Sequence, residues 1–155
     1  MKYIICDVDG TISDPKHRLH HLKKNDWDSF YEACDKDTPI EPVVTLVKLL
    51  WIHYQFVFIT GRRESVREKT TLWINKHILE PAVIETRIPV MNQYYLLMRP
   101  DGDTRHDIQI KPELLSNFPY VVPEDIAFCI EDRDSMVRKW RAMGLTCLQT
   151  AKGDF

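Results

Sequence analysis

Two carboxylates follow a short apolar segment near the start of the chain. Residues 3–6 suit a strand buried on both faces, and Asp7 and Asp9 come directly after it. Side chains two residues apart on a strand point the same way, and Gly10 allows a sharp turn after them. Two like charges this close are costly unless a cation or a reaction compensates. The spacing therefore indicates one site that faces both carboxylates, although it also fits a strand that simply ends in a turn.

Two later apolar segments also end in residues that could do chemistry. One ends in Thr60, Gly61 and Arg62, and the other ends in Glu131 and Asp132. The carboxyl ends of parallel strands lie on one edge of a sheet, so both groups would converge on the first carboxylate pair. Each group alone also fits an ordinary strand-to-helix turn, with acids favoured at the start of the helix.

The chemistry that such a site supports is phosphoryl transfer. Carboxylates from two strands suit a hard cation such as Mg²⁺, which keeps several waters for a phosphate-bearing substrate. Asp7 would attack phosphorus and form an aspartyl-phosphate, and Asp9 would protonate the leaving oxygen and later deprotonate a water molecule. The phosphate oxygens would be held by the Thr60 hydroxyl and by cations, for which the candidates are Arg18, Arg62 and Lys111.

The elements that must position these residues alternate between strands and helices. The apolar segments predict strands at 3–6, 55–60, 94–98, 126–130 and 145–150. Helices are predicted at 26–34, 43–53, 64–78, 111–118 and 134–143, while 82–92 has no assignment. The helix in 104–118 is expected to start near Lys111, because Pro112 belongs in a first turn. Gly144 is expected to close the last helix. This order predicts an α/β fold in three layers, with a central parallel sheet of about five strands flanked by helices.

Residues 13–24 form a polar stretch between the first strand and the first helix. It contains Arg18 and the histidines His17, His20 and His21, but no cysteine. Without cysteine or an evident acidic partner, a transition-metal site is disfavoured. We expect a small solvated flap over the Asp7 site.

Composition limits the other possibilities. The chain has 155 residues, 44% hydrophobic and 28% charged, and a formal net charge of -2. These values predict one soluble domain over residues 1–155, and a polyanion would have to meet a local basic cluster. No signal peptide or membrane span is predicted, so a cytoplasmic location and no membrane partner are expected. The four cysteines show no ligand spacing and are expected to be buried hydrophobes in a reducing compartment.

Four motifs carry a resemblance to a known superfamily. In order along the chain they are Asp7-Val8-Asp9-Gly10-Thr11, Ile59-Thr60-Gly61-Arg62, Lys111, and Glu131-Asp132-Arg133. This series resembles the Rossmann-like haloacid dehalogenase (HAD) superfamily of phosphotransferases. Residues 102–111 and 147–155 resemble more closely the phosphatase half of bacteriophage polynucleotide kinase/phosphatases, and the resemblance covers nearly the whole chain.

The resemblance implies a role for each matching residue. Asp7 would be the nucleophile, Asp9 the acid/base, Lys111 an active-site residue, and Arg18 a flap arginine needed for activity. Substrate or phosphate binding is assigned to Gly10, Thr11, Thr60, Gly61, Arg62 and Asp107. Metal binding is assigned to Asp7, Asp9, Glu131 and Asp132, with Asp132 as the main side-chain ligand. Glu131 departs from the family, which usually has aspartate there.

The implied function is a Mg²⁺-dependent polynucleotide 3′-phosphatase acting on DNA or RNA 3′ ends, and in the family also on 2′,3′-cyclic phosphate ends of RNA. Phosphatases of free nucleotides or other small phosphomonoesters would use the same motifs, and a non-catalytic nucleic-acid-binding relative is a third alternative. The chain contains no G-x-x-x-x-G-K-[ST] string, so no kinase domain is expected. The sequence is compatible with either a monomer or a homodimer.

Overall fold

A five-stranded parallel sheet forms the centre of the protein. The computed structural model describes residues 2–81 and 94–153. The strands, in sheet order, are β5 (Tyr95–Arg99), β4 (Gln55–Arg63), β1 (Tyr3–Cys6), β6 (Ile126–Arg133) and β7 (Cys147–Gly153). All four neighbouring pairs are parallel. Both β4 and β6 run about three residues farther than their apolar segments, so the motif residues belong to the strand ends themselves.

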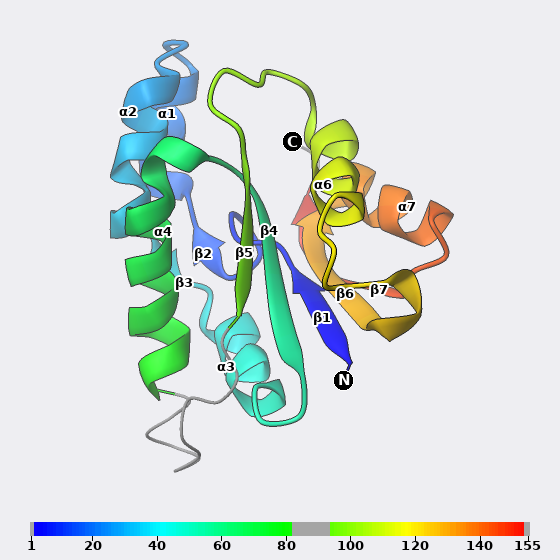
Figure 1. Ribbon diagram of the computed structural model, residues 1–155. Coiled ribbons are helices and arrows are strands. Elements are labelled where there is room, and N and C mark those ends of the chain that lie inside the picture. The colour runs from blue at the N-terminus through cyan, green and yellow to red at the C-terminus, as the bar shows by residue number, and fades with distance from the viewer. Residues whose placement is uncertain (1, 82–93, 154–155) are drawn as a thin grey trace.

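Helices cover both faces of this sheet (Figure 1). α3 (Glu41–Leu50) and α4 (Arg67–Ile74) lie on one face, and α6 (Asp107–Ser116) and α7 (Asp134–Ala142) on the other. Alternate residues of β4 serve the two layers, since Phe56 and Phe58 belong to one hydrophobic core and Val57 and Ile59 to the other. The predicted three-layer α/β fold is confirmed.

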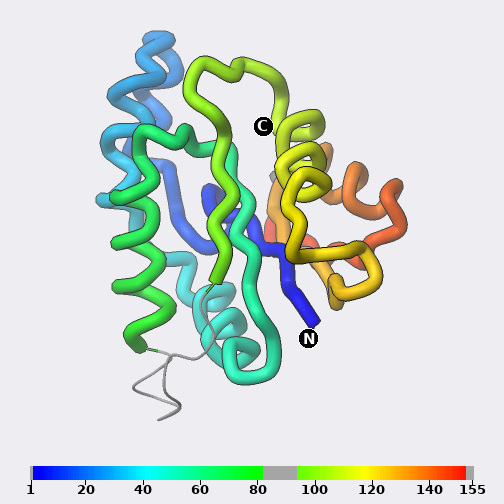
Figure 2. Tube along the Cα trace, viewed as in Figure 1, coloured from blue at the N-terminus to red at the C-terminus, as the bar shows by residue number. Residues whose placement is uncertain are grey.

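A segment inserted between β1 and α3 contains the stretch 13–24 predicted as a flap but extends farther, and the flap is defined here as residues 13–39. Its ends pair as a small antiparallel sheet of β2 (Ser13–Asp14) and β3 (Thr38–Pro39). Between them lie η1 (Lys16–Arg18), α1 (Leu19–Leu22), α2 (Trp27–Glu32) and η2 (Ala33–Lys36). The Asp26 side chain caps α2 by accepting from Ser29 N. Figure 2 shows the helical part of the flap beside the upper part of α4, at the end of the molecule toward which β4 and β5 run.

Two helix predictions need correction. α6 begins at Asp107 rather than near Lys111, and Pro112 lies inside it. The Asp107 carboxylate pairs with Arg99 and Arg133, and these tertiary contacts fix the first turn. Pro112 then forgoes a single bond to the carbonyl of the exposed Ile108.

The predicted helix at 64–78 is divided into three parts. A 3₁₀ turn η3 (Glu64–Val66) precedes α4, and a π-helical turn η4 (Asn75–Leu79) follows it. A 3₁₀ turn η5 (Pro123–Asp125) also leads into β6. The predicted closure of α7 is confirmed, because Gly144 has a φ of 84°. The segment 82–92 lies outside the described residues.

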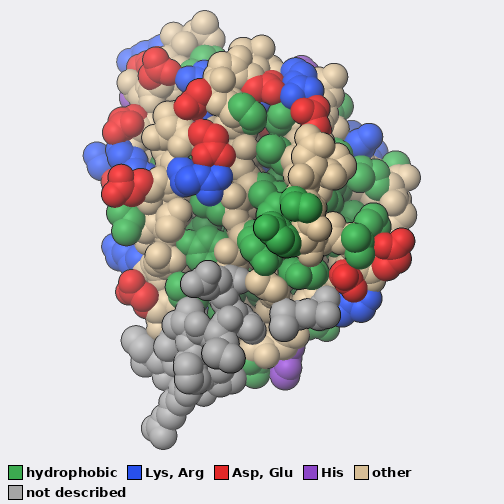
Figure 3. Space-filling model, viewed as in Figure 1, with side chains coloured by type: hydrophobic (Ala, Val, Ile, Leu, Met, Phe, Trp, Pro, Cys, Tyr) green, Lys and Arg blue, Asp and Glu red, His purple; other side chains and the backbone are tan. Residues whose placement is uncertain are grey.

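The surface carries charges of both signs, and the cysteines are buried, as the sequence predicted. The face in Figure 3 intersperses basic and acidic side chains around a hydrophobic group near its middle. The four cysteines, at positions 6, 34, 129 and 147, are all buried and free of disulfides. Among the described residues, none of the helices has the length and apolar character needed to cross a bilayer.

Candidate active site

The site lies where the strand order changes direction. From β1 the chain adds β4 and β5 on one side of the sheet and β6 and β7 on the other. Asp7 N donates to Ile130 O of the neighbouring strand at 3.0 Å, so the chain is still joined to β6 where it leaves β1. Ligands of open α/β sheets bind at the carboxyl ends of the strands at such a position. A cavity of about 410 Å³ opens here, and Asp7, Asp9 and Asp132 line it.

A buried acidic cluster surrounds Lys111 at the base of the cavity. Asp7, Glu131 and Asp132 each offer one oxygen within 4.8 Å of the others. Lys111 Nζ lies 2.6 Å from Asp7 Oδ1 and 3.0 Å from Glu131 Oε2. Thr11 Oγ1 lies 3.0 Å from Asp7 Oδ2 and 3.1 Å from Asp132 Oδ1, and its hydroxyl donates to one of them at a time. The convergence predicted for β1 and β6 is therefore observed.

The charges of this cluster are only partly balanced. Burial, together with repulsion from Glu131, raises the pKa of Asp7 to about 7, although Lys111 acts in the opposite direction. Burial and the charge of Asp7 raise the pKa of Asp132 to about 6, and burial also raises the pKa of Glu131. Burial by itself would lower the pKa of Lys111, but Asp7 and Glu131 raise it above its usual value. Three carboxylates thus face a single ammonium group.

The donor set fits a divalent cation. All its ligand atoms are carboxylate oxygens, which Mg²⁺ prefers, and the cluster has an excess of negative charge. Both Glu131 oxygens already have partners, because Oε2 accepts from Lys111 and Oε1 accepts from Asp132 N and Arg133 N at 3.3 Å. Asp7 and Asp132 are therefore the residues best placed to hold Mg²⁺, while Glu131 orients Lys111.

Gly10 makes room for this arrangement. Its φ is +88°, and a Cβ added there would collide with the carboxylate of Asp132. Gly10 N donates to Ser13 O at 2.8 Å, which closes the sharp turn expected after the first carboxylate pair. The glycine is thus required both by the backbone conformation and by the close approach of β6.

A second buried cluster holds Asp9. Its Oδ1 accepts from Arg18 Nη2 at 2.6 Å, and from Arg62 Nη2 and Nε at 2.6 and 3.0 Å. Asp37 Oδ2 accepts from the same two nitrogens, Arg18 Nη2 at 2.7 Å and Arg62 Nη2 at 2.8 Å. Two guanidinium groups and two carboxylates therefore balance each other. Burial would raise the pKa of Asp9, but Arg62 and Arg18 outweigh it and hold that pKa well below its usual range. The Asp9 side chain lies outside the carboxylate cluster proposed for the cation.

The prediction of Arg18 as a solvated flap cation needs correction. Arg18 is completely buried, with its guanidinium carbon 4.2 Å from the centre of the Phe30 ring and Nη1 donating to Phe30 O. Burial of this cation is tolerated because Asp9 and Asp37 neutralise it. Asp37 follows 19 residues later, and nothing in its spacing connects it to Arg18.

Two residues expected to contact phosphate instead support Asp9. Thr60 and Arg62 are buried, and Thr60 Oγ1 accepts from Arg62 N at 3.2 Å. Neither lines the cavity, whereas Gly61 between them does. Tyr31 donates to Gly61 O at 3.3 Å. Over residues 60–62, the exit of β4 thus presents Gly61 to the cavity rather than the polar side chains on either side of it.

Asp107 lines the cavity beside Gly61. Its Oδ1 accepts from Arg99 Nη2 at 2.5 Å and its Oδ2 from Arg133 Nη1 at 2.9 Å. A Cβ on Gly61 would lie 2.8 Å from Asp107 Oδ1. Asp107 is therefore a neutralised anchor that sets the positions of two arginines at the cavity wall.

Sequence reasoning missed several cavity residues. The cations that line the cavity besides Lys111 are Arg63, Arg99, Arg105 and Arg133. The flap contributes mainly apolar side chains to it, namely Pro15, Leu19, Leu22, Trp27, Phe30 and Tyr31. The polar flap residues do not line the cavity, and His17 pairs with Asp37 at 2.8 Å. The positions of Arg63 and Arg133 directly after two of the strand exits were a usable signal, but the positions of Arg99 and Arg105 gave none.

Comparisons with known proteins identify the family of the chain. The family "Polynucleotide kinase PNKP phosphatase domain" matches residues 1–155. A "Putative bifunctional polynucleotide kinase/RNA ligase" of Autographa californica nuclear polyhedrosis virus is 29% identical over 143 residues, which cover 89% of this chain and 17% of that protein.

Solved structures of polynucleotide kinase relatives also resemble this chain. Structures described as the Pnkp1/Rnl/Hen1 complex and the Pnkp1/Rnl/Hen1 RNA repair complex contain chains 29% identical to this one, with TM-scores of 0.75 and 0.72. The match covers 99% of this chain but only 47% and 43% of those chains, so this chain spans less than half the length of these relatives. CbbY from Rhodobacter sphaeroides shares the fold alone, because it is only 11% identical to this chain. Its TM-score is 0.58, and the match covers 100% of this chain and 87% of that chain. With the family match over its whole length, the chain belongs to the HAD-type phosphatase domains of polynucleotide kinase PNKP.

Proposed function

We propose that this protein is a Mg²⁺-dependent polynucleotide 3′-phosphatase that forms an aspartyl-phosphate on Asp7. The observation that carries the proposal is the contrast between two neighbouring carboxylates at one cavity. Asp7 Oδ1 is held by Lys111, while Asp9 Oδ1 is held by Arg18 and Arg62. One carboxylate can thus act as nucleophile while the other handles protons.

Asp7 is positioned as the nucleophile. Lys111 fixes Oδ1, so that Oδ2 is the oxygen that attacks phosphorus, and Thr11 orients it. Mg²⁺ held by Asp7 and Asp132 would neutralise charge on the phosphate and favour the ionised form of Asp7. Lys111 also balances the negative charge that remains on this side of the site after the phosphate has been transferred.

Asp9 is the acid and later the base. In the free protein its low pKa keeps it ionised, and an ionised carboxylate cannot protonate a leaving oxygen. A phosphate dianion bound next to Asp9 raises that pKa, since a nearby like charge disfavours the ionised form. Its contacts with arginine and Ser13 are all made at Oδ1, so Oδ2 would carry the proton to the 3′ oxygen and then take one from water.

The substrate class follows from the cavity wall and the family. Four arginines line the cavity together with six acidic residues, so the wall offers local guanidinium donors to a phosphate in a chain of net charge -2. The related chains in the RNA repair complexes support 3′ ends of RNA as substrates, with DNA 3′ ends as the other polynucleotide candidate. Opening of 2′,3′-cyclic phosphate ends belongs to the same proposal.

The test compares one oligonucleotide sequence in several phosphorylated forms. Release of phosphate is measured from a 3′-phosphorylated DNA, a 3′-phosphorylated RNA, an RNA with a 2′,3′-cyclic end, a 3′-mononucleotide and a 5′-mononucleotide, with Mg²⁺ or with EDTA. We expect the highest kcat/KM for a 3′-phosphorylated oligonucleotide and no turnover in EDTA. A preference for mononucleotides would favour a small-molecule phosphatase instead, and turnover in EDTA would overturn the assigned role of Mg²⁺.

A further inference from the structure

Trp27 is an exposed aromatic residue at the mouth of the active-site cavity. It is the first residue of α2, lines the cavity, and has 43% of its surface exposed. The other three tryptophans, at positions 51, 73 and 140, are 6% exposed or less. What distinguishes this indole from other exposed apolar side chains is its place beside the catalytic residues, where it can contact a ligand.

The surroundings of Trp27 hold the ring in one orientation. Its Nε1 donates to Asn25 Oδ1 at 3.0 Å, and Asn25 has a φ of 56°, which is uncommon for a residue with a side chain. The ring stacks on Tyr31 with centroids 6.1 Å apart and an interplanar angle of 29°, and meets Phe30 edge-on. Both contacts come from α2 itself, so the ring is fixed before any ligand binds.

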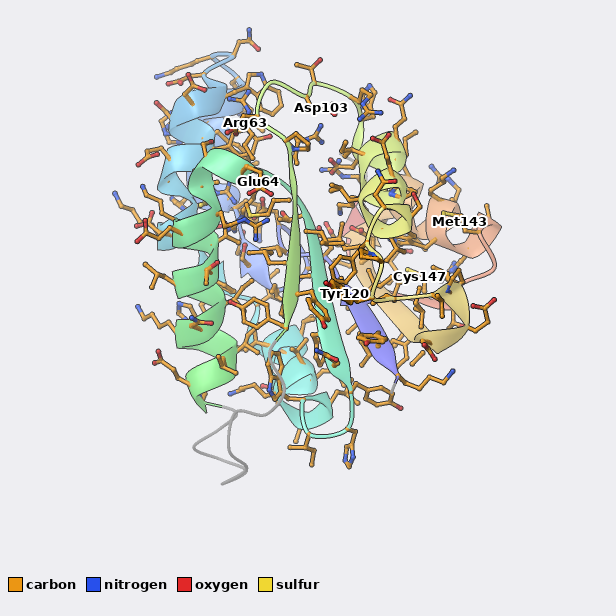
Figure 4. The ribbon with its side chains drawn as sticks, in the orientation of Figure 1. Arg63, Glu64, Asp103, Tyr120, Met143 and Cys147 are labelled. Atoms are coloured by element: carbon orange, nitrogen blue, oxygen red, sulfur yellow. The ribbon has the colours of Figure 1, made fainter. Side chains whose placement is uncertain are left out.

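The same helix is tied to the catalytic residues. Phe30 O accepts from Arg18, which binds Asp9, and Tyr31 donates to the backbone of Gly61 at the exit of β4. Arg63 lies over Tyr31 at 4.9 Å and is turned toward the cavity end of the molecule, where Figure 4 also labels Asp103. Because Tyr31 is covered by Trp27 and Arg63, the face open to a ligand at this wall belongs to Trp27.

We infer that Trp27 is a stacking platform for the terminal nucleobase of a 3′-phosphorylated polynucleotide. This inference rests on the proposed function, because the phosphate on Asp7 defines which base is terminal. Base stacking on an aromatic ring tolerates every base, which suits an enzyme that processes ends of any sequence. The partner is thus a nucleobase with a free face, as found at a single-stranded or frayed end.

The test separates the base from the phosphate. Two oligonucleotides are compared, both with a 3′-phosphate, one ending in a normal nucleotide and the other in an abasic tetrahydrofuran residue. Trp27→Ala is expected to lower kcat/KM for the normal end by roughly 10- to 100-fold, the range typical of one lost stacking contact, and to leave the abasic end within about 2-fold of wild type. Trp27→Phe should retain most of the activity on the normal end.

Two controls make the result decisive. Tyr120→Ala removes an aromatic residue that is 66% exposed and lies outside the cavity, toward the middle of the view in Figure 4, and it should change neither rate. In the inactive Asp7→Asn protein, the normal oligonucleotide should quench tryptophan fluorescence more than the abasic one, and Trp27→Ala should remove that difference. Equal effects of Trp27→Ala on both ends, or no effect on either, would overturn the inference. Absence of any 3′-phosphatase activity in wild type would instead overturn the proposed function.

Discussion

Asp7 and Asp9 are two residues apart, yet the protein drives their pKa values in opposite directions. Asp7 is buried near Glu131 and has one nearby cation, Lys111, so its pKa rises to about 7. Asp9 meets two guanidinium groups, and its pKa falls well below the usual range. Separate environments for paired carboxylates are what distinct nucleophilic and acid/base roles require.

Replacing the nucleophile tests the first of these roles. Asp7→Asn keeps the shape of the side chain but removes the attacking charge, so kcat should fall at least about 10³-fold. Rapid acid quenching with labelled substrate should trap phosphate on the wild-type protein and none on the variant. An unchanged melting temperature within a few degrees would show that the fold is intact, and wild-type turnover by Asp7→Asn would rule out Asp7 as the nucleophile.

Asp37 stabilises the buried arginine cluster, a role that its position in the sequence does not reveal. It accepts from Arg18, Arg62, Ser13 and His17, and all but His17 are buried. Asp37→Asn would leave two buried guanidinium groups with one carboxylate, Asp9. Breaking a buried pair in this way costs about 3–5 kcal/mol, which corresponds to a fall in Tm of roughly 6–20 °C for a chain of this size.

Thermal unfolding followed by circular dichroism measures that effect. Asp35→Asn provides the matched control, because Asp35 lies two residues before Asp37, in the 3₁₀ turn η2, but is exposed. Its Tm should stay within about 2 °C of wild type, as is usual for surface substitutions. If Asp37→Asn were as stable as Asp35→Asn, the balance between the two arginines and the two acids would not be what holds this cluster together.

The sequence predicted the strands of the sheet better than the structure of the flap. Apolar runs place β1, β4 and β6 because a strand buried on both faces needs them, and parallel pairing then brings their ends together. The environment of Arg18 could not be predicted in this way, because it depends on Asp37 and Phe30, which local patterns do not connect to it. The start of α6 was misplaced for a similar reason, since contacts of Asp107 with arginines of β5 and β6 outweigh the preference of Pro112 for a first turn.

The turn after β1 can be tested by substituting its glycine, Gly10. Gly10 and Gly144 both have positive φ values, so alanine at either position should cost about 1–2 kcal/mol in backbone strain. Only at Gly10 would the new Cβ meet the Asp132 carboxylate, whereas nothing lies within 4 Å of the corresponding position at Gly144. Gly10→Ala should therefore reduce kcat/KM by about 10²-fold, the scale of a displaced catalytic group, and Gly144→Ala should not.

Steady-state kinetics across a Mg²⁺ titration distinguishes displacement of Asp132 from general loss of stability. Gly10→Ala is expected to need a higher Mg²⁺ concentration for half-maximal activity than wild type. Gly144→Ala is expected to need the same Mg²⁺ concentration as wild type, although its backbone strain also lowers Tm. Equal kinetics for the two variants would mean that the close approach of Asp132 to Gly10 has no part in binding the cation.

The order of the strands places the acids that follow β1 and end β6 at one switch point of the sheet. Asp7, Glu131 and Asp132 come from distant parts of the chain and become close only in the folded protein. Their mutual repulsion and desolvation are therefore costs of folding rather than properties of any segment. Such costs make the stability of the entire fold depend on pH and on cations.

The sign of that dependence follows from the pKa shifts. The folded pKa values of Asp7 and Asp132, about 7 and about 6, and that of Glu131 are raised, so the folded protein binds protons more tightly there than the unfolded chain. Their favourable contribution is present below the unfolded pKa of about 4 and is lost as pH rises toward 7. Asp9 has a lowered pKa, so its contribution persists above pH 4 and disappears only at lower pH.

Mg²⁺ should reverse this loss, because it replaces the protons on the same carboxylates. We expect saturating Mg²⁺ to raise Tm more at pH 7.5 than at pH 5.5, with a stabilisation near 3 kcal/mol, or roughly 5–10 °C, at about 100 times the dissociation constant. Asp132→Asn removes one of the two carboxylates assigned to the cation and should abolish most of the difference between the two pH values. A Tm increase that is larger at pH 5.5, or one that Asp132→Asn leaves unchanged, would show that Mg²⁺ binds somewhere other than between β1 and β6.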